Sequence, residues 1–526
     1  MGLIVDYQNY ILIAVVIAIL LRAVSGSSET ITRNGKRLRN PPDTLPFVGN
    51  GIKFLQSRWD LLSWFDKCQR QFGYETVALS VPTLPPGVLI HSPQNLEFVF
   101  KNEGLFAKGE FFKRRSWDLF GNGIINADGD LWKVQRKAGL AFLNTANLRV
   151  LTDVALPQYL SASVEKLKTS VGKGPVDLQT VFHEITTNLM GKMAYNMEMH
   201  ADDEFSRAFD FASGATAERF QNPLWQITEI FTGSKFRKST AIVKAFGRRI
   251  VSSAVKDRKT QKSRAISDAP PADEENKLDQ ISGSLIQSLL DTLGDEDVVA
   301  DAALTYLSAG RDTTGQALTW TFYLLLQHPD VVSQIRREIA TLLSHQVSIQ
   351  SPSHNPPSPT PLDLPIHIFT PTALPYTLAV FLETLRLYPP IPFEIRESQS
   401  ATTLPDGTFL PPKSILLWCL WAMQRSRVTW GEDADVFRPE RFLDEEEKLV
   451  NRIAAEFPVF YGGARTCLGR KMAEAIAVVV IPVLVWEFEF EKGWDGEKER
   501  RSQTSLTLPM EGGLPVLVRA RKAGAG

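Results

Sequence analysis

The segment FPVFYGGARTCLGRK, residues 457–471, holds one of only three cysteines in the 526-residue chain, between a glycine pair and a predicted helix. A thiolate is a strong ligand for soft or borderline metals, and it pushes electron density into a haem iron. Arg465 lies two residues before Cys467, and the helix predicted over 468–485 begins directly after it. Because positive potential and a helix N-terminus both lower a thiol pKa, we expect Cys467 to lose its proton readily. The competing interpretation is a buried structural cysteine, which is the commonest fate of a free cysteine.

The wider pattern around Cys467 favours the metal ligand. It reads F-x-x-G-x-R-x-C-x-G, with Phe460, Gly463, Arg465 and Gly469 at the other fixed positions. Glycines carry no Cβ, so the backbone can approach a flat macrocycle closely and direct its amides at the sulfur. Such a pattern is far from chance, and three further motifs accompany it.

AGRDTT, residues 309–314, lies in the middle of the longest predicted helix, 296–328. A glycine and paired threonines are poor helix formers, so they cost stability at that position. A long, well-packed helix can tolerate them, but a local opening of the helix is the interpretation that gives them a purpose.

Two other motifs combine charged and aromatic residues on one helix face. In ETLR, Glu383 and Arg386 are three residues apart within the apolar segment AVFLETLRLYPP, so we expect a buried pair that needs a partner. Arg441 of FRPERF can supply it. In DLWKVQRK, Trp132 and Arg136 are four residues apart, which by itself is typical of a core tryptophan beside a solvated arginine.

With these motifs in this order, the sequence resembles the cytochrome P450 family of haem-thiolate monooxygenases over about residues 41–520. The resemblance implies a mainly α fold with small β-sheets (α+β), a long central helix over the haem and an N-terminal membrane anchor helix. It implies haem b, iron protoporphyrin IX, as the cofactor and Cys467 as the axial ligand of its iron. The remaining haem contacts that it implies are Trp132, Arg136, Arg396, Arg465, Phe460, Gly463 and Gly469, with the arginines directed at the propionates.

The resemblance also implies roles for the other motifs. Asp312 and Thr313 correspond to the acid–alcohol pair that delivers protons to bound oxygen. Glu383, Arg386 and Arg441 correspond to a structural set that locks the segment leading to the cysteine.

The N-terminal segment YILIAVVIAILL is unbroken and apolar and is followed at once by Arg22. A cleaved signal peptide is the alternative, but its n-region would carry no Lys or Arg. The basic residues that follow place the N-terminus in the lumen by the positive-inside rule. We expect a single-pass transmembrane anchor over 1–25, a basic, proline-rich hinge over 26–50 and one catalytic domain over 51–526, cytosolic at the endoplasmic reticulum membrane.

Helical periodicity predicts helices over 296–328 and five further ranges, and turn residues predict two strand pairs and two solvated loops. The helices are 60–74, 130–146, 176–197, 203–221, 238–257 and 296–328. The strand pairs lie over 76–92 and around the DG step of TLPDGTFLPP, with a third hairpin expected around Gly512 and Gly513. The loops are 258–280 and 348–365.

Composition excludes several classes of function. The net charge is −1, which gives no case for nucleic-acid binding, and three widely spaced cysteines do not suggest a disulfide framework. The chain has no H-E-x-x-H, no C-x-x-C and no phosphate-binding loop. It has no nucleotide-binding module of its own, so electrons must come from a separate protein. The resemblance implies NADPH–cytochrome P450 reductase, with cytochrome b5 as a second donor, and we expect a monomer.

Three segments, AGRDTT, ETLRLYPPIP and WGEDADVFRPERF, are similar to the fungal microsomal alkane and fatty-acid hydroxylase branch, which implies a long aliphatic substrate. Glu394 departs from that branch, and if it faces the pocket, an amine or polyol group of a polyketide-like secondary metabolite becomes a partner. The segment 222–236 is predicted to be a loop, and it carries apolar residues that we expect to dip into lipid. The candidate pocket residues are Phe112, Phe120, Ile125, Leu307, Phe393, Glu394 and Leu508.

Two other functions remain open at this point. A haem-thiolate isomerase or dehydratase needs no reductase, but the intact Asp312–Thr313 pair argues against it. A haem-binding carrier or sensor is the more remote alternative. NADPH consumption with reductase and substrate would separate a monooxygenase from a carrier.

Overall fold

The computed structural model describes most of the chain: residues 30–81, 84–264, 282–350, 361–495 and 498–521. The expected anchor over 1–25 therefore lies outside the described residues, as does the loop expected over 265–280. Within the described ranges, no helix combines the length and the apolar character that a bilayer crossing requires.

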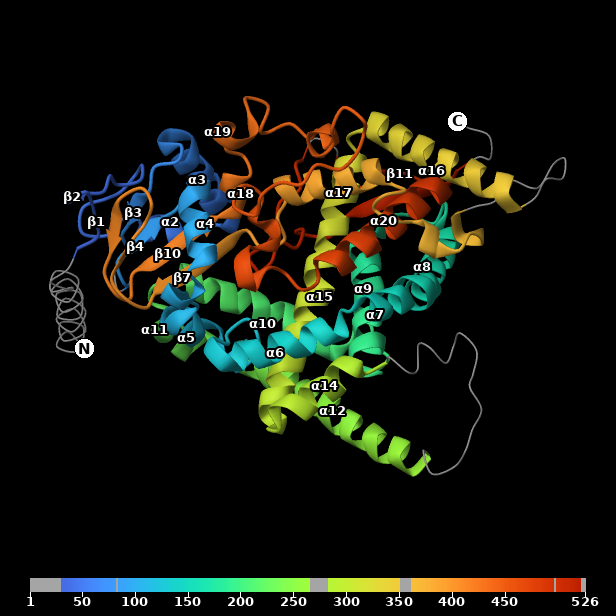
Figure 1. The fold of residues 1–526 in the computed structure, drawn as a ribbon, viewed down its shortest axis with the longest axis horizontal. Coiled ribbons are helices and arrows are strands. Elements are labelled where there is room, and N and C mark those ends of the chain that lie inside the picture. Colours follow the sequence, from blue (N-terminus) through green and yellow to red (C-terminus); the bar gives the residue numbers. More distant parts are fainter. Residues whose placement is uncertain (1–29, 82–83, 265–281, 351–360, 496–497, 522–526) are drawn as a thin grey trace, which may run out of the picture.

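Helices dominate the described chain, and α15 runs through the middle of the molecule (Figure 1). The helices of eight residues or more are α3 (Arg58–Phe72), α4 (Pro93–Lys101), α5 (Gly109–Phe120), α6 (Gly129–Phe142), α8 (Leu156–Ser170), α9 (Leu178–Tyr195), α10 (Glu204–Gln221), α11 (Trp225–Thr232), α12 (Ser234–Arg264), α14 (Ser284–Leu293), α15 (Glu296–Leu325), α16 (Pro329–Gln350), α17 (Pro375–Leu387) and α20 (Arg470–Glu487). Shorter helices are α2 (Gly51–Phe54), α7 (Thr145–Val150), α18 (Leu420–Met423) and α19 (Arg427–Trp430). The helices expected over 60–74, 130–146, 176–197, 203–221, 238–257, 296–328 and 468–485 are all confirmed within a few residues at their ends, apart from the C-terminal extension of α12 described below.

Three small sheets complete the fold, so the expected mainly α class with small sheets is confirmed. The largest has the order β3-β4-β10-β7-β5, in which only the β4–β10 pair is parallel. Its strands are β3 (Val77–Leu79), β4 (Gly87–Leu89), β5 (Phe106–Ala107), β7 (Phe393–Ser398) and β10 (Ile415–Cys419). The second sheet has the order β2-β1-β9-β8, with β1 (Thr32–Arg33), β2 (Lys36–Arg37), β8 (Thr402–Thr403) and β9 (Thr408–Leu410), and it confirms the hairpin at the DG step.

The C-terminal hairpin expected around Gly512 and Gly513 is wrong. β12 (Pro515–Ala520) pairs with β11 (Phe488–Lys492) and with β6 (Val176–Asp177), both distant in sequence. Both glycines do form a turn, with φ of +68° and +69°. The Asp177 carboxylate then accepts a hydrogen bond from the Leu514 amide, at 2.7 Å, and directs the chain onto β6.

The loop expected from residue 258 is also partly wrong, because α12 continues to Arg264. Arg258 provides a local reason, since its Nε donates to Gln287 Oε1 of α14 at 2.8 Å, and its guanidinium also pairs with Asp291 at 2.9 Å. The charged composition of the segment therefore predicted a solvated loop where α12 in fact contacts α14.

α15 is the central element because its sequence is apolar on nearly every side. Asp295 caps its N-terminus by accepting from the amides of Asp297 and Val298. Its thirty residues span about 45 Å at 1.5 Å per residue. A Cβ at Gly310 would lie 2.4 Å from the Met190 sulfur of α9, and one at Gly315 would lie 2.5 Å from His183, so these glycines allow close helix packing.

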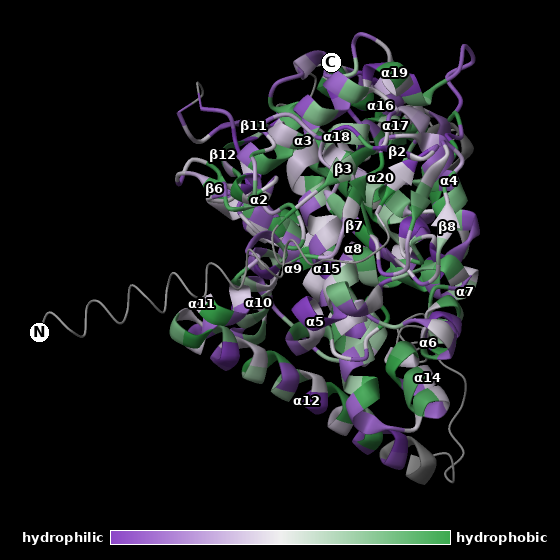
Figure 2. Cartoon of the chain, turned by 90° about the vertical axis from the view of Figure 1, so that its left-hand side faces the viewer, coloured by the Kyte–Doolittle hydropathy of each residue, from purple (hydrophilic) through white to green (hydrophobic). Residues whose placement is uncertain are grey.

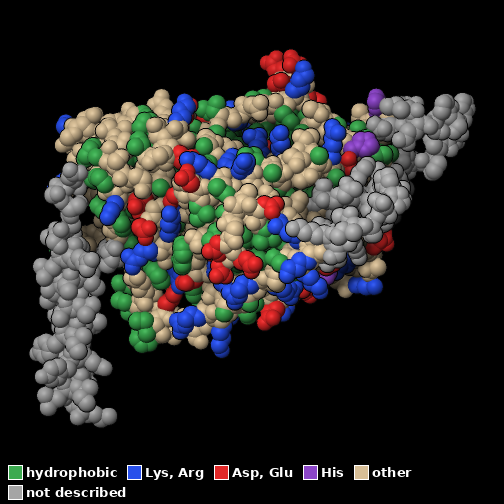
Figure 3. Space-filling view, turned by 60° about the horizontal axis from the view of Figure 1, so that its bottom comes forward, with side chains coloured by type: hydrophobic (Ala, Val, Ile, Leu, Met, Phe, Trp, Pro, Cys, Tyr) green, Lys and Arg blue, Asp and Glu red, His purple; other side chains and the backbone are tan. Residues whose placement is uncertain are grey.

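The surface carries mixed charge. On the face shown in Figure 3, Lys and Arg side chains are interspersed with Asp and Glu rather than gathered into a field of one sign. α11, which Figure 2 shows largely in the hydrophobic colour at the edge of the molecule, exposes 82% of Phe231 and 70% of Ile230. The segment 222–236 contains α11 and the start of α12, so it is mostly helical and not the expected loop. The apolar side chains of α11 such as Ile230 and Phe231 do face solvent.

Candidate active site

Cys467 lies in a tight turn between two helical segments. The 3-10 turn Gly463–Arg465 precedes it and α20 begins at Arg470, while the Cys467 amide donates to the Phe460 carbonyl at 2.8 Å. Its side chain is exposed, whereas Cys68 and Cys419 are buried. The expected metal ligand is therefore the cysteine that an outside group can reach.

The electrostatic surroundings of Cys467 differ from the expectation. Surrounding protein atoms desolvate the thiol and raise its pKa; the amides of Gly469 and Arg470 and the guanidiniums of Arg136 and Arg470 act in the opposite direction. The helix N-terminus contributes as expected, but Arg465 is not among the main influences. Its charge is held by carboxylates, as described below.

The glycine pair before the cysteine serves packing against α4. A Cβ at Gly463, where φ is +63°, would lie 2.2 Å from the Phe100 carbonyl oxygen, and a Cβ at Gly462 would lie 2.3 Å from the Phe100 ring. Gly469 is different, because a Cβ there would meet only the Cys467 sulfur, at 3.9 Å. Of the two glycines predicted to border a macrocycle, Gly469 is thus the one that borders the sulfur.

One face of α15 is left uncovered by protein. Over residues 302–325 every residue is buried except Ala309, Gly310 and Thr313. Gly310 packs against Met190 of α9, whereas Ala309 and Thr313 are four residues apart and share the uncovered side of the helix. The expected helix opening is wrong, because α15 is continuous through this segment and the Thr313 hydroxyl donates to the Ala309 carbonyl at 2.7 Å.

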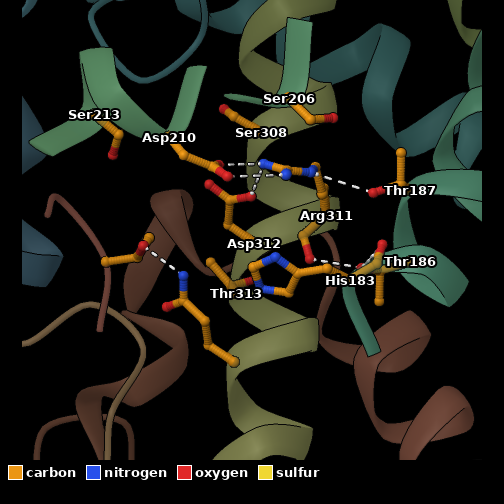
Figure 4. A network of polar contacts seen from close by, with 12 residues as sticks. His183, Thr186, Thr187, Ser206, Asp210, Ser213, Ser308, Arg311, Asp312 and Thr313 are labelled. Atoms are coloured by element: carbon orange, nitrogen blue, oxygen red, sulfur yellow. Dashed lines mark hydrogen bonds and ion pairs between the residues drawn. The ribbon is translucent and has the colours of Figure 1, made fainter. Parts of the chain in front are cut away.

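Asp312 is held by an arginine that joins two helices (Figure 4). Arg311 Nη1 lies 2.7 Å from Asp312 Oδ1 and 2.7 Å from Asp210 Oδ1 of α10, and its Nε donates to Thr187 Oγ1 of α9 at 3.2 Å. Asp312 is buried, whereas the Asp210 side chain is about half exposed. A single guanidinium thus connects a buried carboxyl to one that meets solvent.

Burial raises the pKa of the Asp312 carboxyl to about 7, with Asp210 adding to the effect and Arg311 opposing it. Asp312 is therefore able to gain and lose a proton near neutral pH. His183 of α9 is also close, but burial lowers its pKa to about 4, so it is neutral in that range. Among the described residues, Thr313 makes no hydrogen bond to Asp312. Of the groups around Asp312, only Arg311 could have been found from the sequence, because it belongs to the same motif.

Two of the predicted propionate contacts gather around Trp132 of α6. Arg136 donates to the Thr466 carbonyl at 2.8 Å, and Arg465 lies over the Trp132 ring, 4.6 Å from its centroid. Arg465 already pairs with Glu103 at 2.8 Å and with Asp128 at 2.9 Å. The cysteine turn and α6 are thus joined by charged and aromatic contacts.

Arg396 and Glu394 form a buried charge cluster with Lys108, which the sequence did not reveal. Glu394 Oε2 lies 3.0 Å from Lys108 Nζ and 3.0 Å from Arg396 Nη1. Although burial acts to raise it, these two cations hold the pKa of the Glu394 carboxyl below its ordinary value. The Glu394 carboxylate is therefore neutralised by cations of the protein itself. The structure thus gives no support to the expectation that it binds an amine or polyol group of the substrate.

The other pocket residues divide into two groups. Phe112, Ile125 and Phe393 are partly buried at the edge of the core, and Lys108 Nζ lies 4.2 Å from the centre of the Phe112 ring. Leu307 and Leu508 are fully buried and Phe120 nearly so, which is equally typical of core residues.

The expected structural set is present and buried. Glu383 and Arg386 are both 0% exposed, and Glu383 accepts from Arg386 Nε at 2.7 Å and Nη2 at 2.8 Å. Arg441 Nε lies 3.3 Å from Glu383 Oε1. The expected burial and the expected third partner are thus both found.

These residues fit a haem. The accessible thiol of Cys467 is a suitable iron ligand, and Gly469 leaves its surroundings open. The buried Nε of Arg396 has no hydrogen-bond acceptor in the part of the chain that the structure describes. An unsatisfied buried donor is costly, and a carboxylate such as a haem propionate would satisfy it.

Comparisons with known proteins agree with this arrangement. The family model described as Cytochrome P450 matches residues 40–515. Cytochrome P450 CYP94D108 of Paris polyphylla is 27% identical over 509 residues, which cover 93% of this chain and 95% of that protein. Cytochrome P450 monooxygenase cyp1 of Mycosarcoma maydis is 30% identical over 503 residues, covering 91% of this chain and 74% of that protein. Cytochrome P450 CYP94D109 of Paris polyphylla is 30% identical, with 85% of this chain and 88% of that protein covered.

Proposed function

Because the chain belongs to the cytochrome P450 family of monooxygenases, which bind haem b through a cysteine thiolate, we propose that Cys467 is the axial ligand and that the protein hydroxylates a long aliphatic substrate. We further propose that it is anchored in the endoplasmic reticulum membrane and receives electrons from NADPH–cytochrome P450 reductase. The single observation that carries the proposal is the exposed thiol of Cys467 in a turn directly before α20, while the other two cysteines are buried.

The chain's own residues would hold the cofactor from three sides. Cys467 binds from the turn before α20, Trp132 and Arg136 lie on α6, and Arg396 offers its free Nε from β7. Haem, when bound, supplies the iron at which dioxygen is activated. The protein's part is to hold the group, to exclude water and to deliver protons.

Proton delivery falls to Asp312 and Thr313. The Thr313 side chain lies on the uncovered face of α15, and the neighbouring Asp312 carboxyl titrates near neutral pH. Arg311 pairs with Asp312 and holds it in place. The same guanidinium pairs with Asp210, whose side chain is about half exposed to solvent. We infer that Asp312 takes protons from this side and passes them toward Thr313.

Asp210→Asn is expected to move the alkaline limb of the pH profile to lower pH by about 1 unit. Asp210 raises the pKa of Asp312 directly and also competes for Arg311, so its removal lowers that pKa and depletes the protonated form at neutral pH. Product formed per NADPH consumed, measured from pH 5.5 to 8.5, would show the shift. Asp301→Asn is the control, because its pair with Lys244, at 2.5 Å, also ties α15 to a neighbouring helix but lies about 16 Å from Asp312 along the axis of α15. Equal profiles for wild type and Asp210→Asn would contradict the assignment.

An aliphatic substrate is supported by the candidate lining. Apart from Glu394, its members are apolar, and Glu394 is neutralised by Lys108 and Arg396. A lining of apolar side chains favours a hydrocarbon chain over a polar skeleton.

Membrane association is supported by two groups of exposed apolar residues, one around α2 and one on α11. The end of α10, which leads into α11, lies beside α2, because Gln221 Nε2 contacts the carbonyls of Phe54 and Gln56 at 3.5 Å. The exposed residues of the two groups are Leu45, Phe47, Val48, Ile52, Leu55, Leu224, Ile227, Ile230 and Phe231. Such groups beside a basic segment, with Arg33, Lys36, Arg37 and Arg39, fit the surface of an anionic bilayer.

Co-expression with a reductase tests the whole proposal. The reduced protein under carbon monoxide should show the long-wavelength Soret band of a thiolate-ligated haem. Incubation with NADPH and dodecanoate, 1-dodecanol or dodecane should give products heavier by one oxygen atom. Haem-loaded protein that shows the Soret band but oxidises none of these compounds would refute the aliphatic substrate and leave the thiolate ligand intact.

A further inference from the structure

Arg58, the first residue of α3, differs from the other buried arginines. Seven arginines are buried in the described residues, and five of them meet a carboxylate: Arg219, Arg311, Arg386, Arg396 and Arg441. Arg115 has none, but its Nε and Nη1 donate to the carbonyls of Arg219 and Phe111. Arg58 is 5% exposed, pairs with no carboxylate in the described residues and leaves its Nε without an acceptor.

The surroundings of Arg58 keep it charged but barely compensated. Its Nη2 donates to the Ser505 carbonyl, and its guanidinium lies 5.1 Å from the centre of the Phe393 ring. Burial lowers its pKa to about 10, so the side chain still carries a proton at neutral pH. A buried cation without an anion is strongly unfavourable, which points to an anion supplied from outside the chain.

Arg58 is connected to the uncovered face of α15 by a short loop. Gln316, three residues after Thr313, donates to Thr507 Oγ1 and accepts from the Leu508 amide, both at 2.8 Å. From Leu508 the chain reaches Ser505, whose carbonyl holds Arg58, within three residues, or roughly 10 Å when extended. Of the candidate pocket residues, Phe393 thus lies beside Arg58, and Leu508 contacts Gln316 on α15.

A small apolar cavity, with a volume of about 30 Å³, adjoins the same region. It is lined by residues of α2, the five-stranded sheet, α5 and α10, among them Phe54, Phe220 and Ile395. Phe54 and Phe393 both contact the Phe65 ring, with centroids 6.1 and 5.1 Å away. Cation and hydrocarbon lining thus occur together, as an amphiphile with one anionic end would require.

We propose that Arg58 is the anchor for the carboxylate of the substrate, which makes the substrate a long-chain carboxylic acid rather than an alkane. This inference rests on the proposed function and deepens it. A carboxylate fits because it accepts hydrogen bonds from a guanidinium, and the buried Nε of Arg58 has no acceptor in the described residues. The anchor holds one end of the chain and leaves the hydrocarbon to extend past Phe393 toward Thr313.

The test compares dodecanoate with 1-dodecanol, which has the same chain without the charge. Binding to the full-length, haem-loaded protein is measured by the change in its absorption spectrum. The wild type should bind dodecanoate at least 10-fold more tightly than 1-dodecanol. Arg58→Met should lose this preference, with dodecanoate about 10- to 100-fold weaker and 1-dodecanol unchanged, while Arg58→Lys should retain part of it.

Thermal unfolding gives a second readout that does not need turnover. Without a ligand, Arg58→Met should melt about 2–4 °C above wild type because it removes an uncompensated buried charge. Dodecanoate should raise the melting temperature of wild type but not of Arg58→Met. Arg115→Met is the matched control: it also removes a buried arginine without a carboxylate, and it should leave the binding ratio unchanged.

Each remaining outcome has a distinct meaning. If wild type and Arg58→Met share the same ratio and both oxidise the three compounds, the anchor is overturned and the proposed function stands. If Arg115→Met loses the preference while Arg58→Met keeps it, the anchor is overturned in favour of Arg115. If the wild type binds no dodecyl compound, both the anchor and the aliphatic substrate are overturned.

Discussion

Cys467→Ser is expected to abolish monooxygenase turnover while leaving the protein folded. A serine hydroxyl is neutral near pH 7 and cannot donate electron density to iron as a thiolate does. The side chain is exposed, so the substitution removes no core contact, and the amide that donates to Phe460 is retained. Thermal melts of the haem-free protein should therefore coincide, whereas the reduced carbon monoxide complex should lack the long-wavelength Soret band.

Cys68→Ala is the matched control for this prediction. Cys68 is fully buried in the core, and burial raises the pKa of its thiol to about 12, so it stays protonated. Its loss should lower stability modestly through a small cavity and leave the Soret band in place. A thiolate spectrum in Cys467→Ser, or its loss in Cys68→Ala, would show that the ligand had been assigned to the wrong cysteine.

The sequence supported the local part of this structure well. Helices with strong periodicity lie where they were predicted, because the 3.6-residue repeat is contained in each segment. Glu383 and Arg386 were placed correctly for the same reason, since an i,i+3 pair in an apolar segment has only one way to be buried. The cysteine turn and the AGRDTT segment were recognised because each motif is continuous in sequence.

The predictions that the structure contradicted concern contacts between segments that are distant in sequence. Arg311 meets Asp210, and Glu394 meets Lys108, across 101 and 286 residues. A single sequence shows that Glu394 is charged but not which cation lies beside it, so a carboxylate paired within the protein was interpreted as open to substrate. Likewise, Gly512 and Gly513 signal a turn, but a turn does not say which strand edge receives the chain that follows it.

The predictions about the glycines were incomplete for a related reason. Gly310 and Gly463 were correctly singled out as exceptional, but the neighbour that requires them was not the one expected. Met190 of α9 and the Phe100 backbone occupy the space that a Cβ would take. The absence of a side chain indicates a close approach, and only the packed structure shows what approaches.

The buried cluster around Glu383 gives the largest expected effect on stability. Glu383 accepts from two nitrogens of Arg386 and from the Arg438 amide, the last at 2.9 Å, and it also lies against Arg441. Arg386 further donates to the carbonyls of Gln424 and Ala434, which lie in the segment between β10 and the cysteine turn. Glu383 thus balances the buried Arg386 guanidinium, shares Arg441 with Asp433, which lies 2.7 Å from Arg441 Nη2, and helps to fix the segment that leads to Cys467.

Glu383→Gln is expected to lower the free energy of unfolding by about 3–5 kcal/mol, because it leaves Arg386 buried without an anion. The amide keeps the size of the side chain, so a cavity cannot account for the loss. Urea unfolding followed by circular dichroism would show a lower midpoint at an unchanged slope. The fraction of purified protein that retains the thiolate Soret band should fall as well, since the segment before Cys467 loses its fixed position.

Glu432→Gln is the control that separates burial from charge. Glu432 also pairs with an arginine, Arg427, at 3.3 Å, but both side chains are exposed. Water and salt screen such a pair, so its removal should leave the urea midpoint unchanged. If Glu383→Gln left the urea midpoint equally unchanged, backbone carbonyls would be sufficient for Arg386 and Asp433 would be sufficient for Arg441, and the Glu383 carboxylate would have no structural role. A loss of stability in both variants would instead point to a general effect of net charge, because only burial distinguishes the two sites.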